Sequence, residues 1–540
     1  MTTIQIAFEF HSPDSSPPPG YKRSSGHIIW DVKMDFTRKA RWVKHGHLTK
    51  DPVTSTFAGV VSRESVRILF TYAALNGLDV CAADVQSAYL QAPTSEKHFI
   101  LCGPEFGPER EGCLAIITRA LYGGKSAGSD YWKHMRKCMS SLGFTSCQGD
   151  PDVWRRPATK PDGTTYYTYI CLYVDDCLCI DVSPQTILTD EIGKHWTLKP
   201  SSIGPPTIYL GNKVSKVTLS NDTTCWSFSS SQYVKAAVSN VISHLRERNT
   251  TLPKRASALI RRDYRPEVDI TPELPPQEAA YYQSLIGVLR WIVELGRIDI
   301  TCEVSQMAFM MAMSREGHLD QIFHIFAYLK IKHNAVMVFD PTDPDIDPAD
   351  FPKENWNHTV YSEAKEPIAH NLPKPCGKGF TIRAYVDADH AGNIVTRRSR
   401  TGFFILLNNA PIYWLSKRQT GVETSSFGSE FMAMKHCCEY IRGLRFKLRS
   451  MGIPVELPSY IFGDNKSVLV NGSKPDSVLQ KKSTSVAYHY VREGTAANEW
   501  RLTYVNTDDN CADLLSKPLP SGRKRVKFTS MILHHIYDYD

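Results

Sequence analysis

Hydrophobic and polar residues alternate with regular spacing in several separate stretches of the chain. In residues 62–76 the apolar positions recur every three or four residues, which predicts a helix that ends at Gly77. Similar patterns predict a strand over 79–84, a helix through 322–329, strands over 384–387 and 403–407, and a long helix over 429–449. The chain is therefore predicted to be mixed α/β (α+β), with antiparallel strands.

Two strand-like runs, 165–172 and 177–180, flank the tetrapeptide Tyr-Val-Asp-Asp, which predicts a tight hairpin. A solvated turn is one interpretation of Asp175 and Asp176, because Asp is common in turns. A plain turn more often carries Gly or Asn, whereas Tyr and Val precede this pair. Two adjacent carboxylates repel each other, and burial raises that cost unless a cation joins them. Mg²⁺ is a suitable cation, since it prefers carboxylate oxygens and substrate phosphates.

A further carboxylate, Asp84, lies at the end of the predicted strand over 79–84, in the segment CAADVQSAYLQAP. Polymerase chemistry uses two metals about 3.5–4 Å apart, and carboxylates from two separate strands can hold them. The interval between Asp84 and Asp175 is long enough for helices that bring two strands of one sheet together. The three carboxylates are therefore a candidate metal site.

The composition limits the class of protein without naming a function. The chain has 540 residues, of which 42% are hydrophobic and 22% charged, and these values fit a folded protein of roughly three or four domains. Its net charge of +7 is compatible with nucleic acid but also with many unrelated enzymes. No secretory signal and no run long enough to cross a bilayer is found. The 14 cysteines include no C-x-x-C pair, which argues against a zinc ribbon or disulfide scaffold and predicts reduced thiols.

Six segments before residue 181 resemble, in order, the reverse transcriptase of copia-type LTR retrotransposon Pol polyproteins. They are KARWVKHGH (39–47), TFAGVVSRESVR (56–67), ADVQSAYLQAP (83–93), RALYGGKSAGSDYW (119–132), GFTSCQGDPDVW (143–154) and LYVDDCLCI (172–180). Later matches are YLGNKV (209–214), SSSQYVKAAV (229–238) and YQSLIGVLRWI (282–292). From about residue 39 to 519 the chain resembles the reverse transcriptase and RNase H portion of such a polyprotein.

The resemblance implies roles for the matching residues. Asp84 and Asp175 resemble the two metal ligands of the polymerase, and Asp176 resembles the further carboxylate of the catalytic hairpin. The positions that resemble nucleotide-contacting residues are Lys39, Arg41, Tyr89, Tyr122, Gly123 and Lys125. Each position also has an ordinary alternative when it is considered alone. Lys39 and Arg41 could be surface charges, Tyr89 could be a core aromatic, and Gly123 could belong to an ordinary turn.

Four carboxylates in the last third of the chain resemble the active site of copia-type RNase H. They are Asp387, Glu430, Asp464 and Asp513. Each has an ordinary alternative, such as a helix cap or a solvated side chain. Together they imply a second metal site, which uses two Mg²⁺ ions to activate water against an RNA phosphodiester.

This second site departs from the family pattern at several positions. The family usually has Trp at His390 and Glu at Gly428, and in KKSTSVAYHY (481–490) Ser483 and Ser485 stand at positions that are usually polar and charged. His489 resembles the family's His near the site, although a structural role is an equal alternative. Because all four carboxylates are present, we expect RNase H activity to be retained.

The resemblance and the Pro-, Ser- and Asp-rich stretches together predict a right-hand polymerase of fingers, palm and thumb, with a connection segment and a carboxyl-terminal RNase H-like α/β domain. The predicted domains are a flexible leader (1–26), reverse transcriptase fingers and palm (27–245), thumb and connection with a linker (246–340), a Pro/Asp-rich linker (341–379), the RNase H domain (380–520) and a basic tail (521–540).

The leading hypothesis is an RNA-directed DNA polymerase that also degrades its template. The implied cofactor is Mg²⁺, two ions per active site, with Mn²⁺ as a substitute. The implied partners are an RNA template, a DNA primer, RNA·DNA hybrid, dNTPs and other polyprotein products, with no membrane, in cytoplasmic virus-like particles or the nucleus. The alternative is a catalytically silent nucleic-acid-binding relic of a decayed or domesticated element, against which the retained carboxylates argue.

Overall fold

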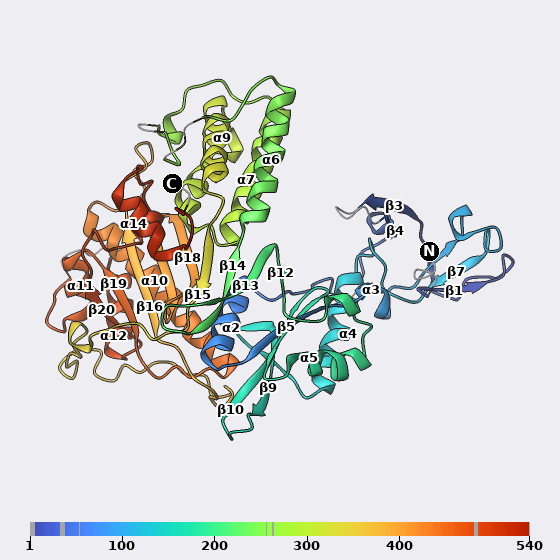
Figure 1. The fold of residues 1–540 in the computed structure, drawn as a ribbon, viewed down its shortest axis with the longest axis horizontal. Helices are drawn as coiled ribbons and strands as arrows, with labels where there is room; N and C mark the ends of the chain where they lie inside the picture. The colour runs from blue at the N-terminus through green and yellow to red at the C-terminus, as the bar shows by residue number, and fades with distance from the viewer. Residues whose placement is uncertain are drawn as a thin grey trace. The chain divides into compact units, whose positions relative to one another are not determined.

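The computed structural model describes residues 6–32, 38–52, 55–254, 256, 258–261, 264–479 and 484–538 (Figure 1). The chain divides into two units. Unit 1 comprises Met1–Ser62 and Asp79–Pro205, and unit 2 comprises Arg63–Leu78 and Pro206–Asp540. The chain therefore passes from one unit to the other three times, and the helix predicted over 62–76 belongs to unit 2.

Unit 1 is built around a five-stranded antiparallel sheet. Its strands, in spatial order, are β5 (Asp79–Asp84), β11 (Asp176–Asp181), β10 (Thr165–Tyr173), β9 (Asp150–Thr159) and β8 (Thr145–Cys147). The predicted hairpin and the predicted strand over 79–84 are both confirmed, and they pair with each other. Helix α4 (Ala127–Ser141) contributes Tyr131, Met135 and Met139 to a core shared with Trp154 and Ile170 of the sheet.

The rest of unit 1 contains two smaller sheets. One has the order β1 (Phe8–His11), β7 (Leu114–Ile117), β6 (His98–Leu101) and β2 (Lys22–Arg23), and the other pairs β3 (Gly26–Val32) with β4 (Arg38–Lys44). The short helices of this unit are α3 (Ala88–Gln91) and α5 (Pro184–Thr186).

Residues 1–26 were predicted to be a flexible leader, but residues 8–11 within them form β1. Phe8 is buried, and its ring lies 5.5 Å from the ring of Trp42 and 5.3 Å from that of Phe106, both edge-on. The apolar residues of FEF over 8–10 therefore anchor β1 in a core, although the Pro- and Ser-rich residues that follow suggested a loop.

Unit 2 begins with α2 (Arg63–Leu75), which confirms the first predicted helix. Its Phe70 packs against a four-stranded sheet, with ring distances of 4.9 Å to Phe228 and 6.0 Å to Phe339. The strands of this sheet, in order, are β12 (Ile208–Tyr209), β13 (Asn212–Thr218), β14 (Thr224–Ser229) and β15 (Val336–Phe339). Gly77, the predicted stop, has a φ of 59°, which a residue without a Cβ adopts at little cost.

Four further helices connect β14 to β15. They are α6 (Ser231–Glu247), α7 (Pro276–Glu294), α8 (Thr301–Ala308) and α9 (Glu316–Ile331). The predicted helical face at 322–329 is confirmed, since Ile322, Ile325, Phe326 and Leu329 are all buried on α9. Throughout the part of the chain that is described, the helices are too short or too polar to cross a membrane.

The last part of unit 2 is a five-stranded mixed sheet with helices. Its strand order is β18 (Ala410–Arg418), β17 (Arg400–Leu407), β16 (Ile382–Ala388), β19 (Ser459–Gly463) and β20 (Trp500–Tyr504). The first three strands are antiparallel, whereas β19 pairs in parallel with both β16 and β20. The helices here are α10 (Ser426–Met451), α11 (Lys466–Ser473), α12 (Ser485–Ala496), α13 (Asp513–Ser516) and α14 (Arg523–Ile532).

Residues 521–540 were predicted to be a basic tail, and the structure shows a packed helix within them. Residues 523–532 form α14, on which Arg525, Phe528 and Ile532 are buried. Arg525 forms an ion pair with Glu303, with 2.9 Å between Nη1 and Oε1. The basic run alone gave no sign of this helix, because its buried partner lies more than 200 residues earlier in the chain.

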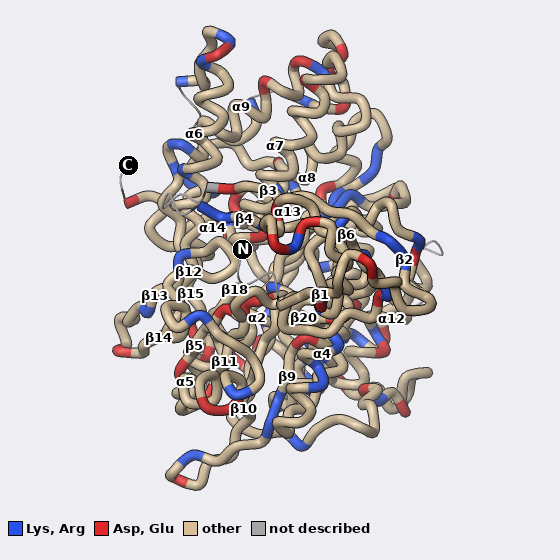
Figure 2. The backbone as a smooth tube through the Cα atoms, turned by 90° about the vertical axis from the view of Figure 1, so that its right-hand side faces the viewer, with Lys and Arg blue, Asp and Glu red and all other residues tan. Residues whose placement is uncertain are grey.

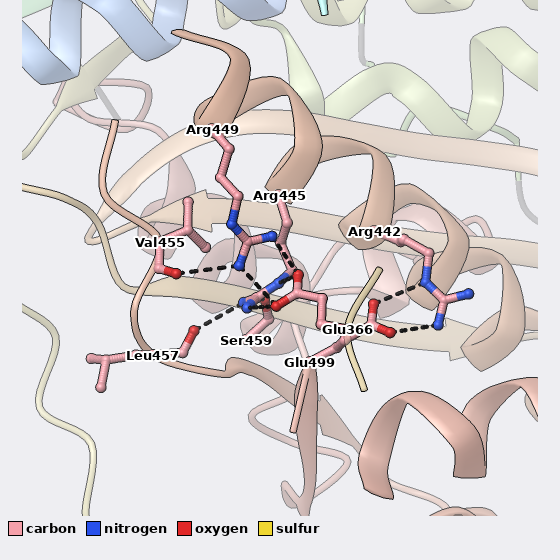
Figure 3. A network of polar contacts seen from close by, with 8 residues as sticks. All are labelled: Glu366, Arg442, Arg445, Arg449, Val455, Leu457, Ser459 and Glu499. Atoms are coloured by element: carbon pink, nitrogen blue, oxygen red, sulfur yellow. Dashed lines mark hydrogen bonds and ion pairs between the residues drawn. The ribbon is translucent and has the colours of Figure 1, made fainter. Parts of the chain in front are cut away.

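The carboxylate of Glu366 links the Pro/Asp-rich stretch over 341–379 to α10 (Figure 3). Glu366 accepts two hydrogen bonds from Arg445, at 2.6 and 2.8 Å, and two from Arg449, at 2.5 and 2.8 Å. Burial alone would raise the pKa of Glu366, but the two guanidinium groups outweigh it and lower the pKa to about 2.

We expect Glu366→Gln to lower the stability of unit 2 by about 2–3 kcal/mol at pH 7. The folded pKa lies below the ordinary value of 4.5, so the stabilisation is fully present above about pH 4.5 and is lost as the pH falls towards 2. Urea unfolding between pH 3 and pH 7 measures this, and the difference in stability between the two proteins should shrink towards the acid end of the range. Glu363→Gln, on an exposed residue of the same stretch, is the control.

Candidate active sites

Three carboxylates of unit 1 meet at one end of its central sheet. Asp84 ends β5 and lies directly opposite Asp176, the first residue of β11. Asp175 lies in the turn of the hairpin, and its carbonyl accepts a 2.8 Å hydrogen bond from the Val85 amide. Val174 holds a φ of 55°, an unusual conformation for a β-branched residue. The turn is therefore strained, and it is fixed to the strand that carries Asp84.

The charges at this end of the sheet are incompletely compensated. Burial, followed by the nearby Asp175 and Asp84, raises the pKa of Asp176 to about 6. Lys199 forms an ion pair with Asp84 and opposes that rise. The Oδ1 atom of Asp84 is buried, and among the described residues it has no hydrogen-bond partner. These oxygens could hold a divalent cation, because such ions take carboxylate ligands.

Two tyrosines border the cluster. The rings of Tyr89 and Tyr122 lie 5.1 Å apart, and the guanidinium of Arg41 lies 5.5 Å from the centre of the Tyr122 ring. Burial and the charge of Asp175 both raise the pKa of Tyr89. Arg41, Tyr89 and Tyr122, distant in sequence, are thus brought together beside the carboxylates.

Gly123 lies where the loop after Tyr122 packs closely against the end of β4. Its φ of 82° lies in the left-handed region, and a Cβ there would overlap with the Lys44 carbonyl oxygen. The Lys44 amide donates a 2.8 Å hydrogen bond to the Tyr122 carbonyl, so β4 is held against this loop. Lys125 donates to the Thr49 carbonyl at 2.7 Å and to Asp51 at 2.8 Å. Its ammonium group therefore fixes a loop in this structure.

Lys39 lies on β4, two residues before Arg41 and opposite Asp31 of β3. Both basic side chains are half-buried. Alternate residues of a strand point to the same face, so Lys39 and Arg41 lie on one face of this hairpin.

A second carboxylate cluster lies in unit 2. Asp387 on β16, Glu430 on α10 and Asp464 just after β19 each offer an oxygen, and these oxygens lie within 4.8 Å of one another. Asp513, the first residue of α13, is held by Lys517 and Lys524, each at 2.6 Å. Lys517 also lies 3.6 Å from Asp387. The structure therefore brings all four predicted carboxylates to one place.

These carboxylates differ in protonation. Burial and the charge of Asp513 raise the pKa of Asp387 to about 7, although Lys517 opposes the shift. Burial, Asp387 and Asp464 raise the pKa of Glu430 to about 9. Burial also acts against the charged form of Asp513, but Asp387 and the two lysines lower its pKa. Two carboxylates with raised pKa values, Asp387 and Glu430, beside further acidic residues form a site that a divalent cation would stabilise.

We therefore expect Mg²⁺ binding at this cluster to release protons and to strengthen as the pH rises from 6 to 9. Because Glu430 and Asp387 have raised pKa values of about 9 and 7, a cation must displace about one to two protons at pH 7. Calorimetric titration in two buffers of different ionisation enthalpy measures this number. Glu430→Gln should release fewer protons, and binding that does not change with pH would contradict the prediction.

The departures from the family pattern can now be located. Gly428 lies on α10 beside Glu423, whose carboxylate occupies the space that a Cβ at Gly428 would meet. His390 Nδ1 lies 3.5 Å from the Ser429 hydroxyl. His489 Nδ1 lies 2.6 Å from the Tyr361 hydroxyl, which favours a structural role. Ser485 begins α12, and Ser483 lies outside the described residues.

Three lysines at these sites were not predicted. Lys199 pairs with Asp84, whereas Lys517 and Lys524 pair with Asp513. Lys524 lies in the predicted basic tail over 521–540, and Lys517 follows Asp513 by four residues. Lys199 follows no motif, and only the fold brings it to Asp84.

Residues 19–246 match the family model described as reverse transcriptase (RNA-dependent DNA polymerase). The match covers less than half of the chain, and it makes residues 19–246 similar to reverse transcriptases. The mixed α/β fold is as predicted.

The comparison with known proteins also confirms the predicted resemblance to copia-type Pol polyproteins. The chain is 24% identical over 528 residues to the Retrovirus-related Pol polyprotein from transposon RE1 of Arabidopsis thaliana, covering 94% of this chain and 32% of the relative. It is 22% identical over 494 residues to that from transposon TNT 1-94 of Nicotiana tabacum, covering 90% and 33%. The chain thus spans about a third of these relatives. A foamy viral protease-reverse transcriptase in complex with ds DNA matches with 12% identity and a TM-score of 0.46, covering 89% of this chain and 65% of that one.

Proposed function

We propose that the chain is an RNA-directed DNA polymerase of a copia-type retrotransposon that also cleaves the RNA strand of RNA·DNA hybrids. The observation that carries the proposal is the occurrence of two separate clusters of converging carboxylates, one in each unit. The match of residues 19–246 to the reverse transcriptase family supports the polymerase half.

The residues of unit 1 have complementary tasks in this proposal. Asp84, Asp175 and Asp176 would hold Mg²⁺, which supplies charge neutralisation for the triphosphate and lowers the pKa of the primer 3′-hydroxyl. The buried Oδ1 of Asp84 and the raised pKa of Asp176 fit such a cation. Lys39 and Arg41 bind the triphosphate of the incoming dNTP by charge-assisted hydrogen bonds. Tyr89 packs beneath the sugar and excludes a 2′-hydroxyl.

Two further positions of unit 1 complete the proposal. Gly123 allows the backbone of the loop after Tyr122 to approach the nucleotide and template closely. The ammonium group of Lys125 either moves from Thr49 and Asp51 to contact the template, or stays in place and holds that loop against the template. Either role positions the template strand rather than the reacting atoms.

In unit 2, Asp387, Glu430 and Asp464 would hold Mg²⁺ for hydrolysis of an RNA phosphodiester, with Asp513 as the fourth carboxylate. Oxygen donors alone make up this set, which suits Mg²⁺ and also Mn²⁺. Lys517 and Lys524 keep Asp513 ionised. The proposed partners are an RNA template, a DNA primer, their hybrid, dNTPs and other polyprotein products, in cytoplasmic virus-like particles or the nucleus.

Primer extension tests the proposal. The full chain should extend a DNA primer on an RNA template in Mg²⁺ and stop when EDTA is added, and labelled template RNA in the same reaction should be cut. If a folded chain binds the primer–template but neither extends nor cuts it, the proposal fails and the silent nucleic-acid-binding relic is the better description.

A further inference from the structure

Three histidines at one end of the β3–β4 hairpin of unit 1 take no part in the proposed function. His27 lies on β3, His45 directly follows β4, and His47 lies two residues further along the chain. Charged side chains of both signs are spread over the described chain (Figure 2), whereas this histidine cluster offers neutral ring nitrogens. Imidazole nitrogens are ligands for Zn²⁺, Cu²⁺ and Ni²⁺, while Mg²⁺ takes oxygen ligands.

The pairing of the two strands explains why two of these histidines meet. The His45 amide donates a 2.8 Å hydrogen bond to the Ser25 carbonyl, so these two residues lie opposite each other. His27 lies two residues beyond Ser25, which makes it a diagonal neighbour of His45 on the same face of the hairpin. Lys44 points to the other face, where it forms an ion pair with Glu96, so its charge lies away from the histidines.

One nitrogen of each ring points toward the other ring. His27 Nδ1 lies 2.7 Å from His45 Nε2, while the ring centres lie 4.8 Å apart, so the two nitrogens lie between the centres. In such a hydrogen bond one nitrogen donates its proton and the other offers its lone pair. A tetrahedral Zn²⁺ holds two imidazole nitrogens about 3.3 Å apart, because each bond is about 2.0–2.1 Å long. A small rotation of the side chains therefore admits the ion in place of the proton.

The surroundings of His45 orient its ring and leave the other two rings able to turn. Ser25 Oγ lies 2.9 Å from His45 Nδ1, which directs Nε2 towards His27. A hydrogen bond to the second ring nitrogen is typical of a histidine that binds a metal. His27 and His47 are exposed, and the centre of the His47 ring lies 5.6 Å from that of His45. Rotation of the His47 side chain brings a third nitrogen to the pair, and water completes a set of four ligands.

We propose that His27, His45 and His47 bind one divalent transition-metal ion of the Zn²⁺ type, with Ser25 as a positioning residue. The ion joins the start of β3 to the end of β4 and so closes the open end of this hairpin. The inference goes beyond the proposed function, because the site uses no carboxylate of either cluster and needs neither polymerase nor nuclease activity.

Calorimetric titration of the full chain with Zn²⁺, in an excess of Mg²⁺ that competes for the carboxylate clusters, tests the proposal. We expect the wild type to bind one Zn²⁺ that the double variant His27→Gln, His45→Gln does not bind. Ser25→Ala should weaken this binding about tenfold, because the outer partners of metal-binding histidines contribute about 10–100-fold to affinity. Ser25→Thr keeps the hydroxyl and should restore it. His195→Gln, at an exposed histidine elsewhere in unit 1, is the matched control.

The visible spectrum of bound Co²⁺ identifies the ligands independently. We expect the wild type to show the bands of a site with nitrogen and oxygen ligands, and His47→Gln to change them. Charge-transfer bands from thiolate ligands would place the ion at cysteines and overturn the proposal. If Zn²⁺ binds the folded double variant as tightly as the wild type, the histidines form only a hydrogen-bonded contact, and the proposal is wrong. Thermal unfolding in EDTA establishes that the variants fold.

Hydrogen exchange tests the same site without any substitution. Zn²⁺ should slow the exchange of the backbone amides of β3 and β4 in the wild type, because an ion bound to both strands restricts their separation. Unchanged exchange at a Zn²⁺ concentration that saturates the calorimetric site would contradict the proposal. Failure of this inference leaves the enzymatic proposal intact, and a folded chain that neither extends nor cuts leaves the metal site intact.

Discussion

Asp175→Asn is expected to reduce RNA-templated nucleotide incorporation by at least about a hundred- to a thousandfold. The substitution keeps the shape of the side chain but removes one of the three negative charges that converge at the end of β5 and β11. Its backbone carbonyl still accepts the hydrogen bond from Val85, so the turn should stay in place. Single-nucleotide extension in Mg²⁺ measures the loss.

Three controls make this result specific. Asp162→Asn, in the exposed turn between β9 and β10, should extend primers at the wild-type rate, because Asn can still accept the hydrogen bond from the Thr164 amide. Primer–template binding by Asp175→Asn should persist. Cleavage of template RNA should also persist, since its carboxylates lie in the other unit. Unchanged incorporation in Asp175→Asn would show that the metal site is assigned to the wrong residues.

Arg525→Ala is expected to destabilise unit 2 by about 3–5 kcal/mol, because it leaves a buried carboxylate without its partner. Glu303 is 1% exposed, and Arg525 is its ion-pair partner at 2.9 Å. Arg525 also donates hydrogen bonds to the backbone carbonyls of Asp299, at 2.5 Å, and Leu519, at 3.1 Å. Both carbonyls lose this donor in the variant. Chemical unfolding followed by tryptophan fluorescence measures the change.

Arg523→Ala, on an exposed residue of the same helix, should change stability by no more than about 0.5 kcal/mol. The double variant Arg525→Met, Glu303→Met removes both charges and should recover much of the loss. A single variant as stable as Arg523→Ala would mean that α14 does not contribute to the core in solution.

The sequence predicted the local parts of both sites well. The hairpin pattern and the strand over 79–84 each place a carboxylate at a strand end, and their pairing in one sheet brings Asp84 opposite Asp176. Asp387 and Glu430 likewise stand in the strand and the helix that periodicity predicts, whereas Asp464 was assigned only through the resemblance to the family. The functional roles given to these residues, and to the six nucleotide-contacting positions, stay predictions.

Long-range partners could not be predicted. Glu366 lies in a stretch whose composition indicates a linker, and its pairing with Arg445 and Arg449 depends on how that stretch packs along α10. Lys199 meets Asp84 only because the chain after β11 returns to the end of β5. The strand at 8–11 was missed because its apolar residues are few and loop-forming residues follow them. The predicted domain boundaries stay predictions as well.

The membership of α2 in unit 2 determines how the protein can be taken apart. A fragment that ends at residue 205 would contain α2 but none of the strands against which Phe70 packs, and would expose a helix with nine buried residues to water. Such a fragment is a candidate for aggregation even if its own sheets fold. A protease that cuts only between residues 205 and 206 would leave α2 seated in the other unit, and the nicked protein would stay in one piece. Because residues 63–78 belong to unit 2 while the segments on either side of them belong to unit 1, no single cut of the chain separates the two units into two complete fragments.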